Sequence, residues 1–449
     1  MTGAVDADRH YAAGLATALL AGPWERAELR RNCALALGRS RLPVWVVALV
    51  DQLLDRVSAA PYDAPRALAE LLPTLPAWTA GRVSRSRLPI VAWQPVPTTM
   101  VERRWPVRVV DDVSELARLL DVTPAELAWF ADVRSLERSV ASPLRHYRVE
   151  VRRKPGGAVR VLEAPKPRLR EMQRRLLRHL IAPVTVHPAA HGCVPGRSVR
   201  TALAPHAGHG TVLRCDLAGF FTSIAAGRIW GVLRMAGLPE AVAHAITGLA
   251  TTTLSAQAWR AIERPDDVDA AAAHRLLGRQ LATPHLPQGA PTSPGLANLV
   301  AFHLDRRLSG LAAALELTYT RYVDDLIFSG PDLRAAKLFA AIERIVVDEG
   351  FHVAWHKNVV LSPSGRQQLL GGVVNVKTTV PRRDLDRLRA ILHNCAVHGW
   401  VSQARGADRE QFRHRLEGRV AWVNALDPRR GDQLRALLAA VDWTPVHAV

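Results

Sequence analysis

The spacing of apolar residues divides the chain into a helical first part, a middle part with strands and a helical last part. Residues 1–140 carry apolar side chains at helical spacing, interrupted at Gly22-Pro23 and Pro43. We therefore expect a helical N-terminal extension. Its composition is compatible with a packing role and with a partner-binding role.

A capping signal lies near the end of this extension. Thr123 stands before Pro124 and Glu126, the order typical of a helix N-terminus. The two helical stretches around it resemble a helix-turn-helix in outline. Because neither stretch is a basic recognition helix, the pattern favours a plain helical hairpin.

From Tyr147 the pattern changes to strand-like alternation. The stretch HYRVEVRRKPGGAVRVLEAP alternates β-forming and basic residues around Pro155-Gly156-Gly157 and predicts a hairpin. After Asn375 the chain is again helical and rich in arginine. We place the middle part at residues 141–375 and the last part at residues 376–449.

An acidic pair interrupts the apolar pattern of the middle part. Asp324 and Asp325 lie between apolar residues in RYVDDLIFSG, where like charges repel and burial is costly. A third carboxylate, Asp216, ends the apolar strand TVLRCD. If the strand end and the hairpin tip are adjacent, the carboxylates form a site for Mg²⁺, which prefers oxygen ligands and is often shared with substrate phosphates. This arrangement is typical of two-metal phosphoryl transfer.

A loop rich in small residues separates the two acidic segments. The stretch LPQGAPTSPGLANL leads into a helix that we expect over Leu296 to Leu308. Backbone amides and the Gln288 side chain can approach a nucleotide closely in such a loop.

Composition narrows the compartment and the partners. The 449 residues suffice for two or three folding units, and 59 Lys and Arg against 41 Asp and Glu give a net charge of +18. This excess of positive charge favours a polyanionic partner. The alternative is a basic, soluble protein that binds no polyanion. The cysteines lack C-x-x-C spacing, and the apolar run LPVWVVALVDQLL is shorter than the roughly 20 residues of a membrane span. We expect a cytoplasmic protein without metal-binding cysteines, disulfides or a membrane anchor.

Four motifs in order carry a family resemblance. DLAGFF, LPQGAPTSPGLANL, YVDD and LLGGVVN follow one another as in a reverse transcriptase, and the chain resembles the bacterial retron-type enzymes within the defence-associated reverse transcriptases. The resemblance implies an α+β right-hand polymerase: fingers and palm in residues 141–375, a thumb in residues 376–449 and the helical N-terminal extension in front. It implies an RNA-directed DNA polymerase.

The resemblance also assigns roles to individual residues. It makes Asp216, Asp324 and Asp325 the catalytic ligands of two Mg²⁺ ions, with Mn²⁺ as an alternative. The implied nucleotide-binding residues are Arg160 and Lys154 at the triphosphate, Phe221 as the gate against a ribose 2′-hydroxyl, Gln288 beside the nascent pair and Lys357 near the departing pyrophosphate. The implied RNA- and DNA-binding residues are His191, Arg197, His206, Gly371, Gly372, Arg415 and Arg419.

The implied partners are dNTPs, a noncoding RNA template with its RNA–DNA hybrid, and an accessory effector protein in antiphage defence. Two departures from the retron pattern leave the lineage open: Ala202 stands where an asparagine is usual, and LGG replaces Val-Thr-Gly. The alternative is a defence-associated reverse transcriptase of a non-retron lineage, with protein-primed or weakly templated synthesis. The intact carboxylates argue against a nonenzymatic RNA-binding scaffold.

Overall fold

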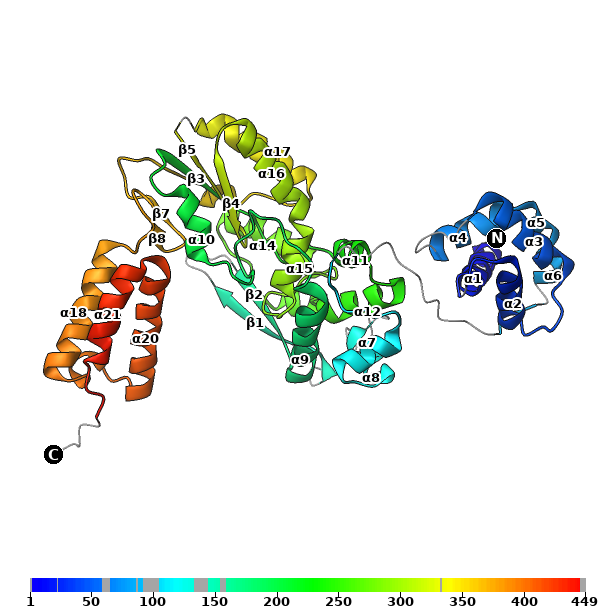
Figure 1. Ribbon diagram of the computed structural model, residues 1–449, viewed down its shortest axis with the longest axis horizontal. Helices are drawn as coiled ribbons and strands as arrows, with labels where there is room; N and C mark the ends of the chain where they lie inside the picture. Colours follow the sequence, from blue (N-terminus) through cyan, green and yellow to red (C-terminus); the bar gives the residue numbers. More distant parts are fainter. Residues whose placement is uncertain are drawn as a thin grey trace. The chain divides into compact units, whose positions relative to one another are not determined.

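The computed structural model describes residues 2–21, 23–58, 65–85, 88–91, 105–132, 144–153, 159–331 and 333–444 (Figure 1). The chain divides into two compact units, residues 1–184 with 225–292 and residues 185–224 with 293–449. The units alternate along the sequence, and each is described by itself below. The boundaries after residues 140 and 375 stay predictions.

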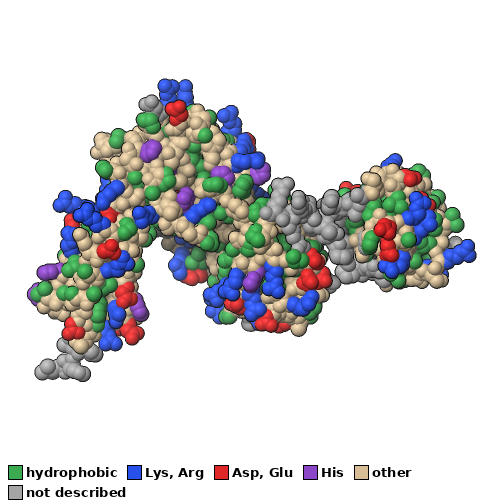
Figure 2. All heavy atoms as spheres, viewed as in Figure 1, with side chains coloured by type: hydrophobic (Ala, Val, Ile, Leu, Met, Phe, Trp, Pro, Cys, Tyr) green, Lys and Arg blue, Asp and Glu red, His purple; other side chains and the backbone are tan. Residues whose placement is uncertain are grey.

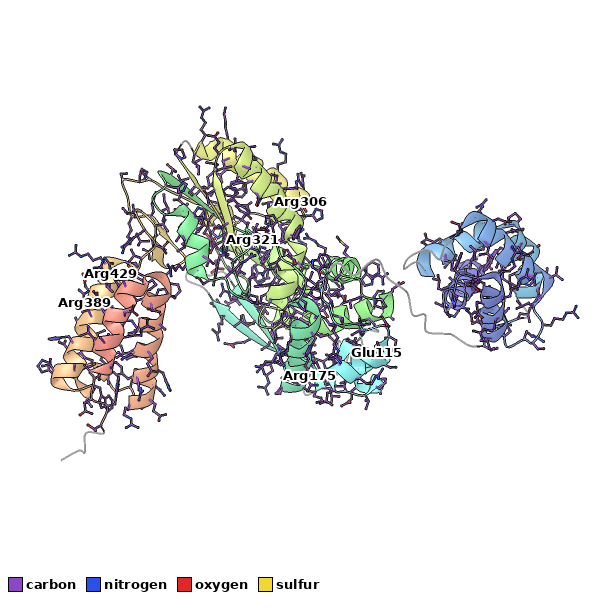
Figure 3. The ribbon with its side chains drawn as sticks, viewed as in Figure 1. Glu115, Arg175, Arg306, Arg321, Arg389 and Arg429 are labelled. Carbon is purple, nitrogen blue, oxygen red and sulfur yellow. The ribbon has the colours of Figure 1, made fainter. Side chains whose placement is uncertain are left out.

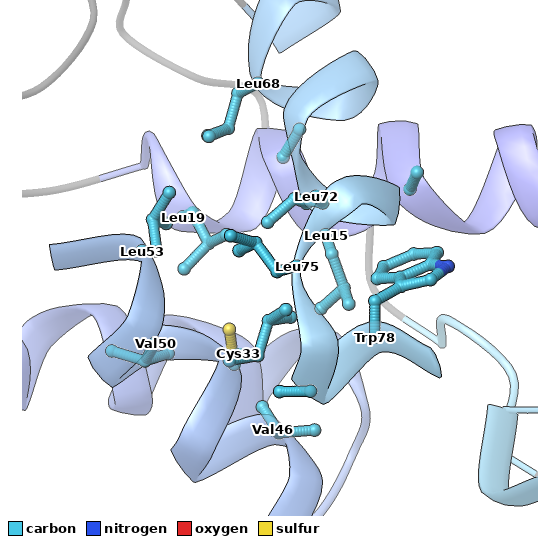
Figure 4. Close-up of a cluster of buried hydrophobic side chains, with 14 of the residues drawn as sticks. Leu15, Leu19, Cys33, Val46, Val50, Leu53, Leu68, Leu72, Leu75 and Trp78 are labelled. Carbon is cyan, nitrogen blue, oxygen red and sulfur yellow. The ribbon is translucent and has the colours of Figure 1, made fainter. Parts of the chain in front are cut away.

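The first unit begins with short helices, most of which contribute side chains to one apolar core. They are α1 (Thr2–Leu19), α2 (Arg26–Ala36), α3 (Val44–Arg56), α4 (Pro65–Leu71), α5 (Pro76–Ala80) and α6 (Arg82–Arg85), with the 3-10 turn η1 (Leu72–Thr74). Leu15, Val50 and Leu72 of this core are completely buried (Figure 4). The prediction of short helices in this region is confirmed, and burial of their apolar faces stabilises them.

An arginine closes one side of this core. The guanidinium of Arg85 lies 4.1 Å from the ring centroid of Trp78 and 5.7 Å from that of Trp45. It also donates to the Asp8 carboxylate at 3.1 Å. The ring faces and the carboxylate together compensate the burial of its charge.

A capped helical hairpin follows, formed by α7 (Val113–Leu120) and α8 (Pro124–Ala131). The Glu126 amide donates to the Thr123 hydroxyl, and the Thr123 amide donates to the Glu126 carboxylate at 2.8 Å. These bonds satisfy amides that the first helical turn leaves unpaired. The capping prediction is confirmed.

The rest of the first unit combines a two-stranded sheet with helices. Strands β1 (Tyr147–Arg153) and β2 (Val159–Pro165) pair antiparallel, as predicted, and their turn lies outside the described residues. The helices are α9 (Pro167–Leu176) with its π-helical extension η4 (Leu177–Ile181), α11 (Ala226–Met235), α12 (Glu240–Ala250), α13 (Ala256–Arg260) and α14 (Val268–Leu281).

The second unit is built on an antiparallel sheet with the strand order β4-β5-β3-β6. Its strands are β3 (Thr211–Asp216), β4 (Thr318–Tyr322), β5 (Asp325–Gly330) and β6 (Val359–Leu361), and its helical segments are α10 (Val199–Leu203), η5 (Ala204–His206), α15 (Ser293–Val300), α16 (Phe302–Ala314), α17 (Ala335–Asp348) and η6 (Trp355–Lys357). Leu326, Ile327 and Phe328 are consecutive and fully buried, so both faces of β5 are covered.

The helix expected over Leu296 to Leu308 is divided in the structure. Helix α15 ends at Val300 and α16 begins at Phe302. Ala301 between them has ψ of 2°, outside the helical range. The prediction of one continuous helix is therefore wrong.

The second unit ends in a short hairpin and a helical bundle. Strands β7 (Gln368–Leu369) and β8 (Gly372–Val373) precede α18 (Arg382–His398), α19 (Val401–Ala404), α20 (Arg409–Leu426) and α21 (Pro428–Ala439). Leu388, Phe412 and Leu434 bury the apolar faces of these helices. None of the helices in the described ranges is both long and apolar enough to cross a membrane.

Candidate active site

Carboxylates from two adjacent strands meet at one end of the second unit's sheet. Asp216 ends β3, Asp325 begins β5, and the antiparallel register places them opposite each other. Asp324 lies in the turn before β5, where its carbonyl accepts a hydrogen bond of 2.9 Å from the Leu217 amide. The structure thus brings together the three carboxylates that the sequence singled out.

The turn that carries Asp324 has a strained backbone. Val323 has φ of 57°, a left-handed conformation that is unusual for a β-branched residue. Two-residue hairpin turns with positive φ at this position normally use glycine. Gly192 approaches the turn so closely that an added Cβ would lie 2.5 Å from the Val323 nitrogen. Such strain persists only where neighbouring groups hold the backbone.

Two basic side chains contact the carboxylates. Lys357 places Nζ 2.6 Å from Oδ1 of Asp216. Arg214 lies two residues before Asp216 on β3, and its Nε is 3.6 Å from Oδ1 of Asp325. These cations supply part of the positive charge that neighbouring aspartates require. The sequence pointed to Lys357 but not to Arg214.

The cations compensate the acidic cluster incompletely. Burial is the largest cause that raises the pKa of Asp325 from 3.8 to about 6. The charges of Arg214 and Lys357 oppose this rise, whereas those of Asp324 and Asp216 add to it. Three carboxylates beside two basic side chains leave an excess of negative charge, and such a site favours a bound cation.

The donor set fits a hard divalent cation. Carboxylate oxygens are the protein ligands that Mg²⁺ and Mn²⁺ prefer. In the described part of the chain, no group of three or more Asp, Glu, His and Cys side chains already surrounds a metal position. The Asp216 carboxylate contacts the Lys357 ammonium instead. The residues therefore fit a metal in type and proximity, and one carboxylate is held by a lysine.

A buried network lies behind the strained turn. Arg321 of β4 and Asp305 of α16 are both completely buried. Nε and Nη2 of Arg321 donate to the two Asp305 oxygens at 2.8 and 2.7 Å. Nη1 donates to the Val323 carbonyl at 2.8 Å and to Oδ1 of Asn298 at 3.1 Å. Arg321, labelled in Figure 3, thus fixes the residue before Asp324.

Sequence reasoning did not single out Arg321, Asp305 or Asn298. A signal was present, because Arg321 is the one charged residue in the strand-forming stretch TYTRYV. Burial alone would lower the pKa of Arg321, but the charge of Asp305 and its hydrogen bonds raise it. A buried cation at this position requires an anion, and only the fold shows which one.

Phe221 lies in the turns after β3 and is partly exposed. Its ring centroid is 5.6 Å from that of Phe220, which in turn lies 5.6 Å from the Phe351 ring. Phe221 lies five residues after Asp216, on the segment that leaves β3. Its role as a sugar gate stays a prediction.

The remaining proposed nucleotide-binding residues belong to the first unit. Arg160 is exposed on β2, and Gln288 is partly buried with its carbonyl accepting a 2.9 Å hydrogen bond from the Glu163 amide. Lys154 lies outside the described residues.

His191 and Arg197 organise the loop before α10. Nδ1 of His191 is 2.9 Å from the Thr201 hydroxyl. Arg197 donates to the carbonyls of His187 at 2.8 Å and Pro188 at 3.1 Å, and to that of Ala190. Both side chains are partly exposed. Their loop contacts are structural, and their contact with nucleic acid stays a prediction.

His206 requires a correction. Its side chain is completely buried, with Nδ1 2.7 Å from the Ser329 hydroxyl and Nε2 2.8 Å from the Thr320 hydroxyl. Burial is the main cause that lowers its pKa to about 3, so the ring is neutral near pH 7. A ring enclosed in this way links β4 and β5 and cannot contact RNA. The RNA contact that the resemblance implied for His206 is therefore wrong.

Gly371 and Gly372 form the tip and second strand of the β7–β8 hairpin. Gly371 has φ of 81°, and an added Cβ would lie 3.1 Å from the Trp422 ring of α20. A Cβ on Gly372 would meet Leu203 at 2.9 Å. The glycines therefore allow close packing of this hairpin, and their nucleic-acid contacts stay predictions.

The arginines of the C-terminal helices fall into two groups. Arg382 and Arg389 pair with Asp386, Arg413 pairs with Glu417, and Arg430 pairs with Asp427. Several others, among them Arg387, Arg415 and Arg419, make no ion pair within the described ranges, and the Arg415 guanidinium lies 5.1 Å from the ring centroid of Phe412. Burial and then the charge of Arg387 lower the pKa of Arg419, with Asp384 opposing and Arg415 adding to the effect. Figure 2 shows basic and acidic side chains interspersed on the visible face of these helices.

Comparison with known proteins identifies the family. The family described as "Reverse transcriptase (RNA-dependent DNA polymerase)" matches residues 152–379. Retron Mx65 reverse transcriptase of Myxococcus xanthus is 38% identical over 321 residues, covering 71% of this chain and 69% of the relative. Retron Mx162 reverse transcriptase of the same organism is 32% identical over 352 residues, covering 75% and 68%. Retron Ec86 reverse transcriptase of Escherichia coli is 26% identical over 331 residues, covering 71% and 90%. The chain therefore belongs to the retron-type reverse transcriptases and is an RNA-directed DNA polymerase.

Proposed function

We propose that this enzyme copies a partner noncoding RNA into DNA by two-metal nucleotidyl transfer, in antiphage defence. The observation that supports the chemistry best is the pairing of Asp216 with Asp325 across β3 and β5, with Asp324 in the adjoining turn. The similarity to named retron enzymes supports a noncoding RNA as the template.

The three aspartates would hold two divalent ions, Mg²⁺ or Mn²⁺. When bound, the ions would help to activate a 3′-hydroxyl and to stabilise charge on the transferring phosphate. Arg321 holds the Asp324 turn through the Val323 carbonyl, which limits the motion of the carboxylates. Lys357 would give up its contact with Asp216 and carry its positive charge to the departing pyrophosphate.

Other residues would select and hold the substrates. Arg160 and Lys154 would bind the triphosphate, Gln288 would lie beside the nascent base pair, and the ring of Phe221 would exclude a 2′-hydroxyl. In the last part of the chain, Arg415 and Arg419, which form no ion pair with a described residue, would bind phosphates of the RNA–DNA hybrid. His191, Arg197, Gly371 and Gly372 would lie along the template and primer.

Sequencing of the nucleic acid that copurifies with the protein, before and after RNase treatment, tests this proposal. We expect one structured RNA together with DNA complementary to part of it. DNA without a complementary RNA would favour protein-primed or weakly templated synthesis by a non-retron lineage. Phage plating on cells that carry the wild type or the Asp324→Asn, Asp325→Asn variant tests the defence role, and equal plating would contradict it.

A further inference from the structure

Glu163 of β2 and His285 form a buried pair in the first unit. Their side chains are 1% and 0% exposed, and Nε2 of His285 lies 2.8 Å from Oε2 of Glu163. Nδ1 of His285 lies 2.7 Å from the Thr283 carbonyl. A carbonyl oxygen only accepts hydrogen bonds, so Nδ1 carries a hydrogen. One further proton must lie between Nε2 and Oε2, and the pair has no net charge whichever atom holds it.

The backbone of Glu163 also contacts the segment that begins with His285, residues 285–289, here termed the Gln288 loop. The Glu163 amide donates to the Gln288 carbonyl at 2.9 Å. Gly289 has φ of 137°, and a Cβ there would lie 3.1 Å from the Glu163 carbonyl oxygen. Side chain and backbone of Glu163 therefore lie against the first residue of the loop, His285, and against its last two, Gln288 and Gly289.

A second contact fixes the start of the loop. The His285 amide donates to the Thr252 carbonyl at 3.1 Å, and the Thr252 amide donates to the His285 carbonyl at 3.1 Å. Because the backbone of His285 is held in this way, its ring has little freedom to follow Glu163. Removal of either side chain would therefore leave the other one buried without its hydrogen-bond partner.

We propose that the Glu163–His285 pair is a positioning device that holds the Gln288 loop on β2, the strand that also carries Arg160. This inference rests on the proposed function, in which Arg160 and Gln288 contact the incoming nucleotide. The pair makes two groups that are distant in sequence move as one body. Its loss should weaken dNTP binding more than it slows the chemical step, because neither group is a proposed metal ligand.

Steady-state kinetics on an RNA template with single dNTPs test the pair. Glu163→Ala and His285→Ala should each raise the KM for dNTP about tenfold and change kcat by less than about threefold. Glu163→Gln should restore most of the affinity, because an amide N–H can donate to Nε2 of a neutral imidazole. The double alanine variant should be no worse than either single one.

Gln173→Ala is the matched control. Gln173 is also completely buried in the first unit, and it donates to the Tyr147 hydroxyl at 2.8 Å and to the Leu249 carbonyl at 2.7 Å. Its loss should lower stability without a selective rise in the KM for dNTP. If Glu163→Ala does not fold, Glu163→Asp serves instead, because it withdraws the carboxylate by one methylene.

Hydrogen exchange gives a readout that does not require activity. Peptides covering residues 159–165 and 284–290 should exchange faster in Glu163→Ala than in the wild type, and Glu163→Gln and Gln173→Ala should match the wild type there. Unchanged exchange and an unchanged KM in folded Glu163→Ala would overturn the proposal, as would a Glu163→Gln variant as impaired as Glu163→Ala. Failure of the proposed function would give a different result: dNTP incorporation on an RNA template would continue in the Asp324→Asn, Asp325→Asn variant.

Discussion

The guanidinium of Arg321 forms a bidentate ion pair with the carboxylate of Asp305, and both side chains are fully buried. The same guanidinium donates to the Val323 carbonyl, in the turn that carries Asp324. One ion pair thus links α16 to the strained turn of the candidate active site. Loss of this ion pair should therefore affect both the stability of the second unit and the placement of the carboxylates.

Removal of one member of this pair should be strongly destabilising. Arg321→Met leaves the Asp305 charge buried without its partner, and we expect a loss of about 3–5 kcal/mol in the free energy of unfolding of the second unit. Arg321→Lys should recover only part of this, because an ammonium cannot bind both oxygens in the same plane. Denaturant titration of the wild type and both variants measures the loss.

The control for this prediction is Arg307→Met. Arg307 also pairs with carboxylates, Asp348 and Glu349, but its side chain is 38% exposed. Its loss should destabilise the protein far less than the loss of Arg321, because exposed ion pairs contribute little to stability. Equal effects of Arg307→Met and Arg321→Met would contradict the importance of the buried pair.

His206 should make stability depend on pH. Burial lowers its pKa from 6.5 to about 3, so the unfolded chain takes up this proton at a higher pH than the folded chain. The stabilisation is complete above pH 6.5 and is lost as the pH falls towards 3. The slope is at most about 1.4 kcal/mol per pH unit.

Comparison with His206→Asn isolates this contribution from that of the titrating carboxylates. The stability difference between wild type and variant should shrink as the pH falls from 6.5 towards about 3. RNA affinity at neutral pH should be the same for both folded proteins, because the ring is enclosed. A pH-independent difference would contradict the buried neutral histidine.

Local patterns in the sequence predicted much of the fold. The strands, the tight hairpin that carries Asp324, and the Thr123 cap depend on neighbours within a few residues. The α+β class is confirmed, and membership of the family assigns the right-hand polymerase fold. The division into fingers, palm and thumb stays a prediction.

Contacts distant in sequence could not be predicted in the same way. Arg321 and Asp305 are 16 residues apart, and Glu163 and His285 are 122 apart. The sequence marks Arg321 as a charge within a strand, but it identifies neither the partner of Arg321 nor that of Glu163, because only the fold brings each pair together. The resemblance likewise gave His206 a role in nucleic-acid binding. Residue type alone could not reveal that its side chain is buried.

Phe221→Ala should relax the choice of sugar. Removal of the ring should admit ribonucleotides, so the ratio of kcat/KM for dNTP to that for NTP should fall. Incorporation of matched dNTP and NTP pairs on one RNA template measures the ratio. Phe220→Leu is the control, because Phe220 is almost fully buried and should affect stability more than sugar choice. An unchanged ratio in Phe221→Ala would place the gate elsewhere.

Arg415 and Arg419, which form no ion pair in the part of the chain that the structure describes, should contribute more to hybrid binding than the paired arginines. Binding weakens as salt rises, and for duplex DNA each phosphate contact makes the slope of log K against log salt concentration more negative by about 0.9. The slope per contact for a hybrid should be somewhat different. Arg415→Gln with Arg419→Gln should weaken binding to all hybrid sequences alike and flatten this slope. Titration of a labelled RNA–DNA hybrid at several salt concentrations measures both effects.

The matched control replaces two arginines that already have carboxylate partners, Arg389 and Arg413. Arg389→Gln with Arg413→Gln removes the same charge from the same helices but should change the slope less. Parallel lines for the wild type and the Arg415→Gln, Arg419→Gln variant would contradict the assignment of this part to the thumb.

The assignment of Asp216, Asp324 and Asp325 as metal ligands is tested most directly by Asp324→Asn with Asp325→Asn. Incorporation of dNTP on an RNA template, measured across a Mg²⁺ titration, should fall by more than about a hundredfold at every concentration. The thermal midpoint without metal should stay the same or rise, because the amides relieve repulsion around Asp325. Asp348→Asn, an exposed carboxylate of the same unit, should remain fully active. Incorporation near the wild-type rate by the folded double variant would contradict the account.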